Sequence, residues 1–395
     1  DRREEGSPVC FWYGAGEPHR PYDWTASRKS NLDLAAIEMP PCFPDNETIR
    51  TDLGDYYLKV QQLDRFAGEI LQRLEKEGEL ENSIVVMTGD NGMPFPRCKA
   101  TLYDRGTRVP LAIRWGKNVK SGRNVSDYVS LTDLAPTFLE AAGIPVPQET
   151  TGRSLLPQLE SSKSGQIDEG RRHVLTGMEQ HVYPWPSRAI RTRDFLYIRN
   201  FIPGEWPTGK VKGKPRVYDF TKTPWPMEPG AFSFNTDPSP TMQWLRLNRN
   251  APSWRDLIDP VFETRPHEEL YDLKSDPHQM VNVAKVPSYS KTRNALAVQL
   301  DTEFRASGDP RYRLKNHASC SIRGWTVHIN DVFWQEQPRV LEKAIDTLQL
   351  QLDRIIDSLP EDKVKELRKV PLWMNPPYEG VRGRAEYHPE AGWLN

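Results

Sequence analysis

Asp90 and Asn91 are neighbouring oxygen-bearing side chains that follow the apolar run of residues 83–88 and precede Gly92. A carboxylate and an amide carbonyl are hard oxygen donors, which suit Ca²⁺ or Mg²⁺ better than Zn²⁺. The glycine would let the backbone turn so that both side chains face one point. Because Asp-Asn-Gly is also a favoured turn sequence, these residues alone fit either a metal site or a plain turn.

Two further side chains could supply positive charge or a proton near this strand end. Lys99 follows soon after Gly92 and could place an ammonium group beside a bound anion. His19 follows a different apolar run, where an imidazole could donate a proton or bind an anion. Taken singly, each residue could equally be a solvated lysine or a structural loop histidine.

The elements that would position these residues alternate between strands and helices. Residues 9–13 are a short apolar run that predicts a buried strand, and residues 55–77 repeat apolar side chains at helical spacing. Further patterns predict strands at 83–88 and 110–115 and a helix at 132–142. Strand, helix and strand in this order predict a parallel α/β sheet, whose ligands gather beyond the carboxyl ends of the strands.

The pattern changes from Val174 onward. Alternating apolar and polar residues there predict antiparallel strands of a second, smaller sheet. Residues 203–265 carry many Pro, Trp and Asn and predict a long irregular excursion, which we expect to build part of a substrate pocket. A boundary is expected near Arg313. The predicted domains are an α/β core at 1–170, a C-terminal subdomain at 171–313 and a separate α+β tail at 314–395.

Composition narrows the classes of protein that fit. A chain of 395 residues is longer than one hydrophobic core usually serves, so two or three domains are expected. A net charge of −1 argues against nucleic acid as the main partner. No apolar window approaches the ~18 residues that a membrane span needs, so no span is expected. The cysteines lie far apart without metal-like spacing, which leaves either buried thiols or a disulfide; they are Cys10, Cys42, Cys98 and Cys320.

The longest motif carries a family resemblance. TGDNGMPFPRCKATLYDRGTRVPL (88–111) is similar to the second metal motif of the sulfatases, in the alkaline-phosphatase-like superfamily. GAGEPHRPY (14–22) resembles the family's loop with an active-site histidine, and ELYDLKSDPHQMVNVA (269–284) resembles its C-terminal signature. DNGMPFP and SRAIRTRDFLYIRNF (187–201) are most similar to the heparan N-sulfatase branch. The resemblance covers roughly residues 8–313, and the tail has no counterpart in sulfatases.

The resemblance implies a fold and a set of roles. The fold would be α/β, an alkaline-phosphatase-like sheet flanked by helices, with a smaller C-terminal antiparallel-sheet subdomain and an additional unrelated tail. Asp90 and Asn91 would ligate one Ca²⁺. Lys99 would contact the sulfate and steady negative charge on the leaving group, and His19 would bind the sulfate or assist proton transfer at the leaving atom. Three further residues would lie near the substrate pocket: Glu179, His181 and Arg188.

The family's nucleophile is a formylglycine, which a formylglycine-generating enzyme makes from Cys or Ser in a Cys/Ser-x-Pro-x-Arg motif. Neither this motif nor the first Asp-Asp metal pair occurs in the chain. The nearest match, at residues 42–46, lacks the arginine and follows the histidine loop, so we reject Cys42 as the nucleophile. We therefore expect the formylglycine in an N-terminal segment that is missing from this sequence.

Three functions remain open at this point. The first is a sulfatase that hydrolyses sulfate esters or sulfamates of sulfated sugars. The second is a phosphoesterase of the same superfamily, which would need extra His and Asp metal ligands that do not cluster beside Asp90. The third is a catalytically dead, carbohydrate-binding homologue, which the missing nucleophile favours. The resemblance implies a secreted or periplasmic protein, or a lysosomal one in a eukaryote, although the first residues hold no signal-peptide core.

Overall fold

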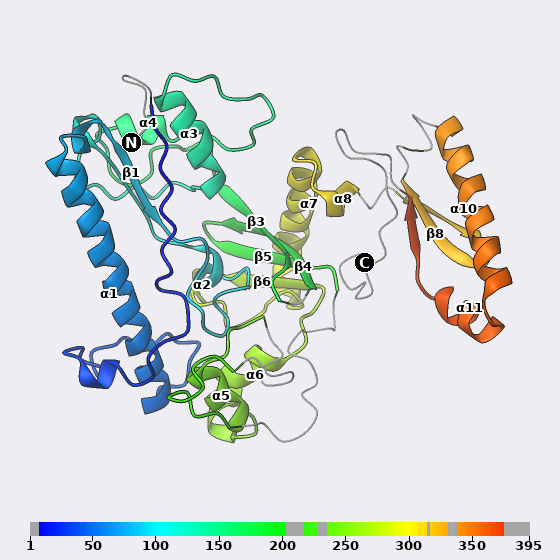
Figure 1. Ribbon diagram of the computed structural model, residues 1–395, viewed down its shortest axis with the longest axis horizontal. Helices are drawn as coiled ribbons and strands as arrows, with labels where there is room; N and C mark the ends of the chain where they lie inside the picture. Colours follow the sequence, from blue (N-terminus) through cyan, green and yellow to red (C-terminus); the bar gives the residue numbers. More distant parts are fainter. Residues whose placement is uncertain are drawn as a thin grey trace. The chain divides into compact units, whose positions relative to one another are not determined.

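The computed structural model describes residues 8–182, 184–202, 217–226, 235–313, 317–330, 333 and 338–374. The chain divides into two compact units, the first reaching to Ala297 and the second beginning at Val298 (Figure 1). The boundary falls within helix α7 (Ser290–Ala306). The predicted division at residues 170 and 313 stays a prediction.

A long helix, α1 (Glu47–Lys76), fills the region where helical spacing was predicted from residue 55. It begins two turns earlier because Asn46 caps it, with the side chain of Asn46 accepting a hydrogen bond from the Ile49 amide at 3.1 Å. Gly78 follows the end of this helix with a φ of +73°. This left-handed backbone conformation commonly terminates helices. The prediction of a helix here is confirmed.

Two predictions about the first strands are wrong. Strands β1 (Ile84–Thr88) and β2 (Leu111–Trp115) pair antiparallel, because the segment between them folds back and the Gly92 amide donates to the Gly106 carbonyl at 2.9 Å. That segment holds only a one-turn helix, α2 (Asp104–Thr107), among its regular elements. Residues 9–13 form no strand and pair with no described strand, and Trp12 is 83% exposed.

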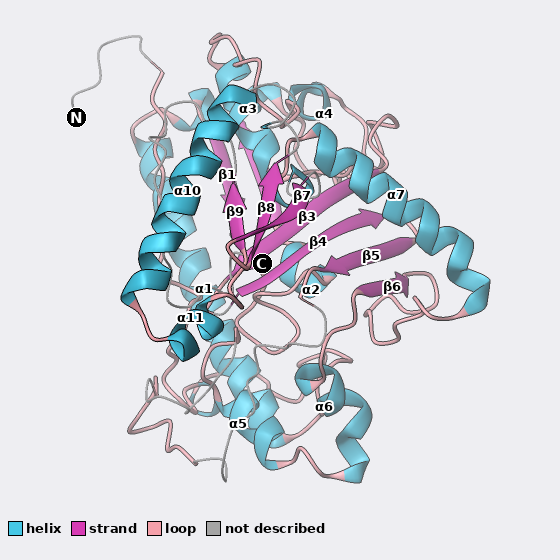
Figure 2. Cartoon of the chain, turned by 90° about the vertical axis from the view of Figure 1, so that its right-hand side faces the viewer, coloured by secondary structure: helices cyan, strands magenta, loops and turns pink. Residues whose placement is uncertain are grey.

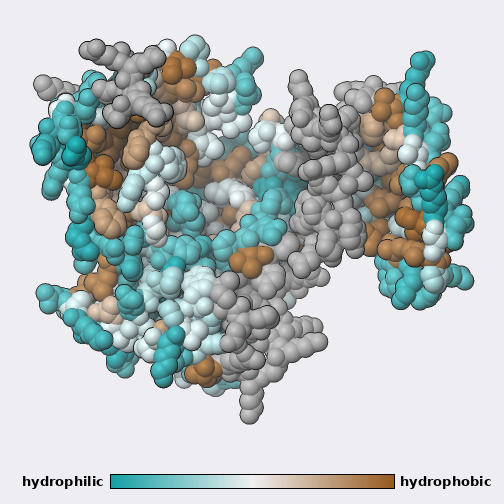
Figure 3. Space-filling view, in the orientation of Figure 1, coloured by the Kyte–Doolittle hydropathy of each residue, from teal (hydrophilic) through white to brown (hydrophobic). Residues whose placement is uncertain are grey.

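Short helices cover one face of the β1–β2 pair. Helix α3 (Leu134–Ala141) confirms the helix predicted at 132–142, and a 3₁₀ turn before it opens at Ser130, whose side chain forms a capping box with Asp133. With α4 (Leu156–Glu160), this helix buries a leucine cluster against the two strands. Strand β1 is only partly buried. In Figure 3, apolar atoms gather over the region that β1 and α3 occupy in Figure 1.

The second sheet of the first unit is antiparallel throughout, as predicted. Its strands lie in the order β3-β4-β5-β6 and follow one another side by side in Figure 2. Alternating residues pack one face of this sheet onto Leu102 and Tyr103, from the long motif that follows β1. The strands are β3 (His173–Gln180), β4 (Pro184–Thr192), β5 (Phe195–Asn200) and β6 (Glu268–Asp272).

The connection between β5 and β6 was predicted to be irregular. Among its described residues, 217–226 form no helix or strand, but the prediction is wrong further along the chain. Helices α5 (Pro240–Leu247) and α6 (Arg255–Phe262) lie in this connection and bury an apolar cluster together. Ser239 caps α5 by accepting from the Met242 amide at 3.1 Å, and Pro240 occupies the first helical position. Residues 203–216 and 227–234 of the excursion lie outside the described residues.

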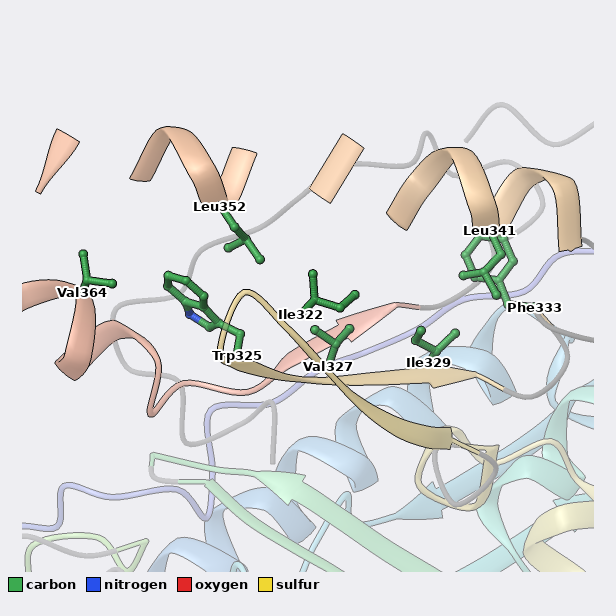
Figure 4. Close-up of a cluster of buried hydrophobic side chains, with 8 residues drawn as sticks. All are labelled: Ile322, Trp325, Val327, Ile329, Phe333, Leu341, Leu352 and Val364. Atoms are coloured by element: carbon green, nitrogen blue, oxygen red, sulfur yellow. The ribbon is translucent and has the colours of Figure 1, made fainter. Parts of the chain in front are cut away.

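The second unit has its own core (Figure 4). Strands β7 (His317–Ile322) and β8 (Trp325–Asn330) form a hairpin, and β9 (Leu372–Met374) pairs parallel with β8. The side chains of Trp325, Val327 and Ile329 point toward the helices and are buried with Leu341 and Leu352. The described helices that follow α7 are α8 (Pro310–Arg313), α10 (Pro338–Ser358) and α11 (Glu361–Leu367). Among the described residues, none of the helices is long and apolar enough to cross a membrane.

Candidate active site

The loop that carries His19 orients its imidazole. The Nδ1 atom lies 2.5 Å from the Arg20 carbonyl oxygen, and both X-Pro bonds beside it, Glu17-Pro18 and Arg20-Pro21, are cis. A carbonyl oxygen can only accept a hydrogen bond, so Nδ1 carries the proton of the neutral ring. In this tautomer the other nitrogen, Nε2, keeps its lone pair.

A buried ion pair holds this loop against helix α1. The Arg20 guanidinium donates to both carboxylate oxygens of Asp52, at 2.8 and 2.9 Å, and to the Pro94 carbonyl at 3.1 Å. Asp52 also accepts from the Thr241 hydroxyl at 2.6 Å, at the start of α5. Although burial by itself would lower the pKa of Arg20, the Asp52 carboxylate raises it. The histidine loop, α1, the segment after β1 and α5 are thereby locked together.

Lys99 lies on a tight loop after β1. Its amide donates to the Met93 carbonyl at 3.0 Å, and the residues Arg97 and Ala100 around it both adopt a left-handed φ of 59°. The Lys99 side chain is 9% exposed. Its Nζ lies 3.1 Å from His19 Nε2, so the structure brings together the two residues that the sequence singled out for sulfate chemistry.

A third residue, which sequence reasoning missed, completes this cluster. The Asp237 carboxylate Oδ2 lies 3.0 Å from Lys99 Nζ and 3.9 Å from His19 Nε2, and its side chain is 7% exposed. Asp237 lies in the excursion just before α5, where no periodicity marks any residue as special. The only sequence signal was our expectation that this excursion builds part of a pocket. The ring of Trp225, from the same excursion, lies 6.0 Å from that of His19 between centroids.

His181 belongs to the same electrostatic neighbourhood. It lies in the turn between β3 and β4, where the next amide, of Val182, donates to the Asn235 side chain at 3.0 Å. Partial burial lowers the pKa of His181, and the Lys99 ammonium lowers it further, while the Asp237 carboxylate opposes both effects. A neutral imidazole is thus favoured at this edge of the cluster.

Glu179 and Arg188, the other residues expected near a pocket, pair with each other across β3 and β4. Arg188 donates to the Glu179 carboxylate at 2.5 Å and to the Ser187 carbonyl at 2.9 Å. Its side chain is buried, and it fills the space above Gly177, where an added Cβ would lie 2.9 Å from Arg188 Cδ. These contacts support the sheet, and a role in binding substrate stays a prediction for both residues.

Asp90 and Asn91 are exposed, and the Asn91 amide donates to Asp90 Oδ1 at 2.8 Å. Two hard oxygen donors fit part of a Ca²⁺ shell, which takes 6–8 oxygens. The described residues contain no group of three or more His, Cys, Asp or Glu side chains that could hold a metal ion. In the described part of the chain these two residues therefore do not form a complete metal site.

Gly92 is needed for packing. It does not adopt a positive φ, but an added Cβ would lie 1.8 Å from the Arg105 carbonyl oxygen. Gly106 is equally confined, since a Cβ there would lie 2.4 Å from the Cys98 and Thr101 carbonyl oxygens. The two glycines let the strand end and helix α2 touch backbone to backbone, which fixes where the Lys99 loop begins and ends.

The cysteines carry none of this chemistry. All four are free thiols, and Cys42 is 2% exposed, with a pKa that burial raises. A buried thiol with a raised pKa is a poor nucleophile. This agrees with the rejection of Cys42 on sequence grounds.

Comparison with known proteins gives matches over the same region. Residues 4–144 match the sulfatase family, and residues 97–205 match the family described as N-sulphoglucosamine sulphohydrolase, C-terminal. The chain is 32% identical to the N-sulphoglucosamine sulphohydrolase of Homo sapiens over 311 residues, which is 74% of this chain and 55% of that protein. It is 29% identical to an ulvan-active sulfatase of Formosa agariphila over 274 residues, 69% of this chain and 41% of that protein.

A solved structure supports the fold. The crystal structure of yidJ from Bacteroides fragilis, a protein assigned to the sulfatases, superposes with a TM-score of 0.50 at 18% identity, covering 72% of this chain and 50% of that one. The chain spans about half the length of the relatives it matches.

Proposed function

Because the chain belongs to the sulfatase family, in the branch similar to N-sulphoglucosamine sulphohydrolase, we propose that it is part of an enzyme that hydrolyses sulfate esters or sulfamates of sulfated sugars. The observation that carries this proposal is the contact between Lys99 Nζ and His19 Nε2, at 3.1 Å, inside a cluster drawn from separate segments of the chain. The match to the N-sulphoglucosamine branch spans Lys99 and His181, which favours a sulfamate over an ester.

An ammonium group and an imidazole side by side suit a sulfate group. Lys99 can donate N–H bonds to sulfate oxygens and balance the negative charge that grows as the bond from sulfur to the leaving atom breaks. His19, held with Nδ1–H on the Arg20 carbonyl, presents Nε2 and can carry a proton to the leaving nitrogen or oxygen. The His19 side chain is 55% exposed, so a substrate can reach its ring.

Two groups outside the described residues belong to the proposal. A formylglycine, installed by a formylglycine-generating enzyme, would supply the attacking oxygen. Asp90 and Asn91 would contribute two of the ligands of a Ca²⁺ ion, whose remaining ligands would come from elsewhere, and this ion would polarise the sulfate. Glu179, His181 and Arg188 would border the sugar, with His181 nearest to the Lys99 cluster.

Activity of the full-length gene product, expressed with a formylglycine-generating enzyme, tests the proposal. Substrates would be N-sulfoglucosamine, a 6-O-sulfated sugar and a phosphate monoester. Lys99→Ala and His19→Ala should each lower kcat/KM for the sulfated substrate by about 10²–10⁴-fold. Lys222→Ala, at an exposed lysine, is the matched control and should leave activity unchanged. Full activity of Lys99→Ala, or a preference for the phosphate monoester, would contradict the proposal.

A further inference from the structure

Asp237 is the one member of the cluster whose charge opposes the binding of an anion. Its carboxylate lies 3.0 Å from Lys99 Nζ, and the two side chains are only 7% and 9% exposed. A carboxylate this close to a lysine that holds a sulfate would also repel that sulfate, so the assigned roles of Lys99 and His19 leave its presence unexplained. Screening by water is weak for groups this deeply buried, so its effect on a bound anion should be large.

The geometry shows how the lysine can serve both partners. An ammonium group has three N–H bonds. One is directed at Asp237 Oδ2 and one at His19 Nε2, at 3.0 and 3.1 Å. The third can reach an oxygen of an anion held in the cluster. Asp237 thus fixes the direction of the ammonium group, while its negative charge opposes the attraction of that group for an anion.

We propose that Asp237 is the counter-charge of the anion site: it positions Lys99 and weakens the hold of the site on a tetrahedral oxyanion, so that sulfate can leave after hydrolysis. This rests on the proposed function, since it takes Lys99 as the sulfate-binding group. Asp237 is a positioning residue that acts through Lys99. Removing the charge of Asp237 should tighten the binding of free sulfate. If Asp237 were merely a structural contact, its loss would weaken sulfate binding.

The test measures the dissociation constant of inorganic sulfate by NMR titration, following the imidazole resonances of His19 in the full-length gene product at pH 6.5. Asp237→Asn keeps a carbonyl that can accept from Lys99 but removes the negative charge, and it should bind sulfate about ten-fold more tightly. Asp237→Glu restores the charge and should bind within about two-fold of wild type. Asp219→Asn, at an exposed aspartate of the same excursion, should leave the affinity unchanged.

A double variant covers the case in which Asp237→Asn does not fold. In Lys99→Gln the buried carboxylate has lost its lysine, and sulfate binding should fall at least ten-fold, as a rough estimate from the loss of one nearby charge. Lys99→Gln with Asp237→Asn leaves no unpaired buried charge at this contact and should recover part of that loss.

The outcomes separate the two proposals. If Lys99→Gln loses sulfate binding but neither Asp237→Asn nor the double variant binds more tightly than its parent, the counter-charge role is overturned and the proposed function stands. If wild type and Lys99→Gln bind sulfate equally, or neither binds it, both proposals are overturned. Tighter binding by Asp237→Asn, or recovery in the double variant, supports the counter-charge role.

Discussion

Tyr103 and Tyr271 meet edge to face, with ring centroids 5.6 Å apart, and both hydroxyls donate to the buried carboxylate of Glu269, at 2.8 and 2.6 Å. Tyr103 belongs to the motif that carries Lys99, and Tyr271 lies on β6. The carboxylate accepts a third hydrogen bond from the Asn200 side chain at 2.7 Å. The motif after β1 is thus joined to the second sheet through one fully satisfied polar network.

We predict that Tyr103→Phe lowers the free energy of unfolding by about 1–3 kcal/mol, because it removes a donor from a buried carboxylate. Burial raises the pKa of both phenols, so each remains a donor at neutral pH. Tyr289→Phe is the matched control, since Tyr289 donates to the Asp272 carboxylate at 2.9 Å where both residues are only partly buried. This change should lower the free energy of unfolding much less. Urea unfolding followed by circular dichroism measures both, and equal losses would contradict the prediction.

The buried Arg20–Asp52 ion pair predicts a second and larger loss of folding stability. Arg20→Met leaves the Asp52 carboxylate buried without its cation, which should cost about 3–5 kcal/mol. Arg323→Met removes an arginine with the same two-point geometry to Asp353, at 2.6 and 2.9 Å, but both side chains are nearly half exposed. The control should therefore lose far less stability in the same urea titration. A small loss for Arg20→Met would mean that the pair does not hold the histidine loop.

The contact between Gly92 and helix α2 predicts that a single methyl group disrupts the motif. Gly92→Ala should cost at least about 2 kcal/mol of unfolding free energy, because the added Cβ meets a backbone carbonyl that cannot move aside. Gly68→Ala, on α1 with open space around the added Cβ, should instead raise stability by about 0.5–1 kcal/mol. Thermal unfolding of both variants shows whether each change raises or lowers stability. Unchanged stability of Gly92→Ala would refute the close approach between Gly92 and the Arg105 carbonyl.

The pKa of His181 gives a prediction about pH. Its pKa in the folded chain lies below the ordinary value of 6.5, first because of burial and then because of the Lys99 ammonium. Between these two pKa values the unfolded chain binds a proton that the folded chain does not, so stability rises with pH there. The contribution of neutral His181 is therefore present above pH 6.5 and lost as the pH falls through the folded pKa.

NMR titration of the His181 imidazole measures this pKa directly. The value should lie below 6.5 in wild type and rise in Lys99→Met, which removes the second cause of the shift. In thermal unfolding, His181→Gln should narrow the difference in Tm between pH 7.5 and pH 5.5. A wild-type pKa at or above 6.5 would show that the imidazole does not face the Lys99 cluster.

The proposed metal ligands predict an effect of calcium. In the full-length gene product, Asp90→Ala should weaken Ca²⁺ binding roughly ten-fold or more, because it removes a charged oxygen ligand. Titration calorimetry measures the affinity, and Asp219→Ala serves as the control at an exposed aspartate. Unchanged Ca²⁺ affinity in Asp90→Ala would place the ion elsewhere.

Much of the architecture was readable from local patterns. The helical spacing of apolar residues predicted most of α1, although not its start at the Asn46 cap, and alternation predicted the antiparallel strands β3 to β5. These features succeed because each depends on neighbours a few residues away. The long motif likewise drew attention to Lys99, which the structure places beside His19, whereas the metal role of Asp90 stays a prediction.

Asp237 shows where local patterns stop. It lies 138 positions from Lys99, in a stretch without periodicity. Its role could be inferred only from the structure, which places its carboxylate beside a buried ammonium group. The antiparallel pairing of β1 with β2 has a similar cause, since it depends on a backbone contact between Gly92 and Gly106. Helical period, caps and alternation are short-range properties that the order of residues encodes directly. The charge balance of the site arises from segments far apart in the chain, and it exists only once packing has brought them within hydrogen-bonding distance.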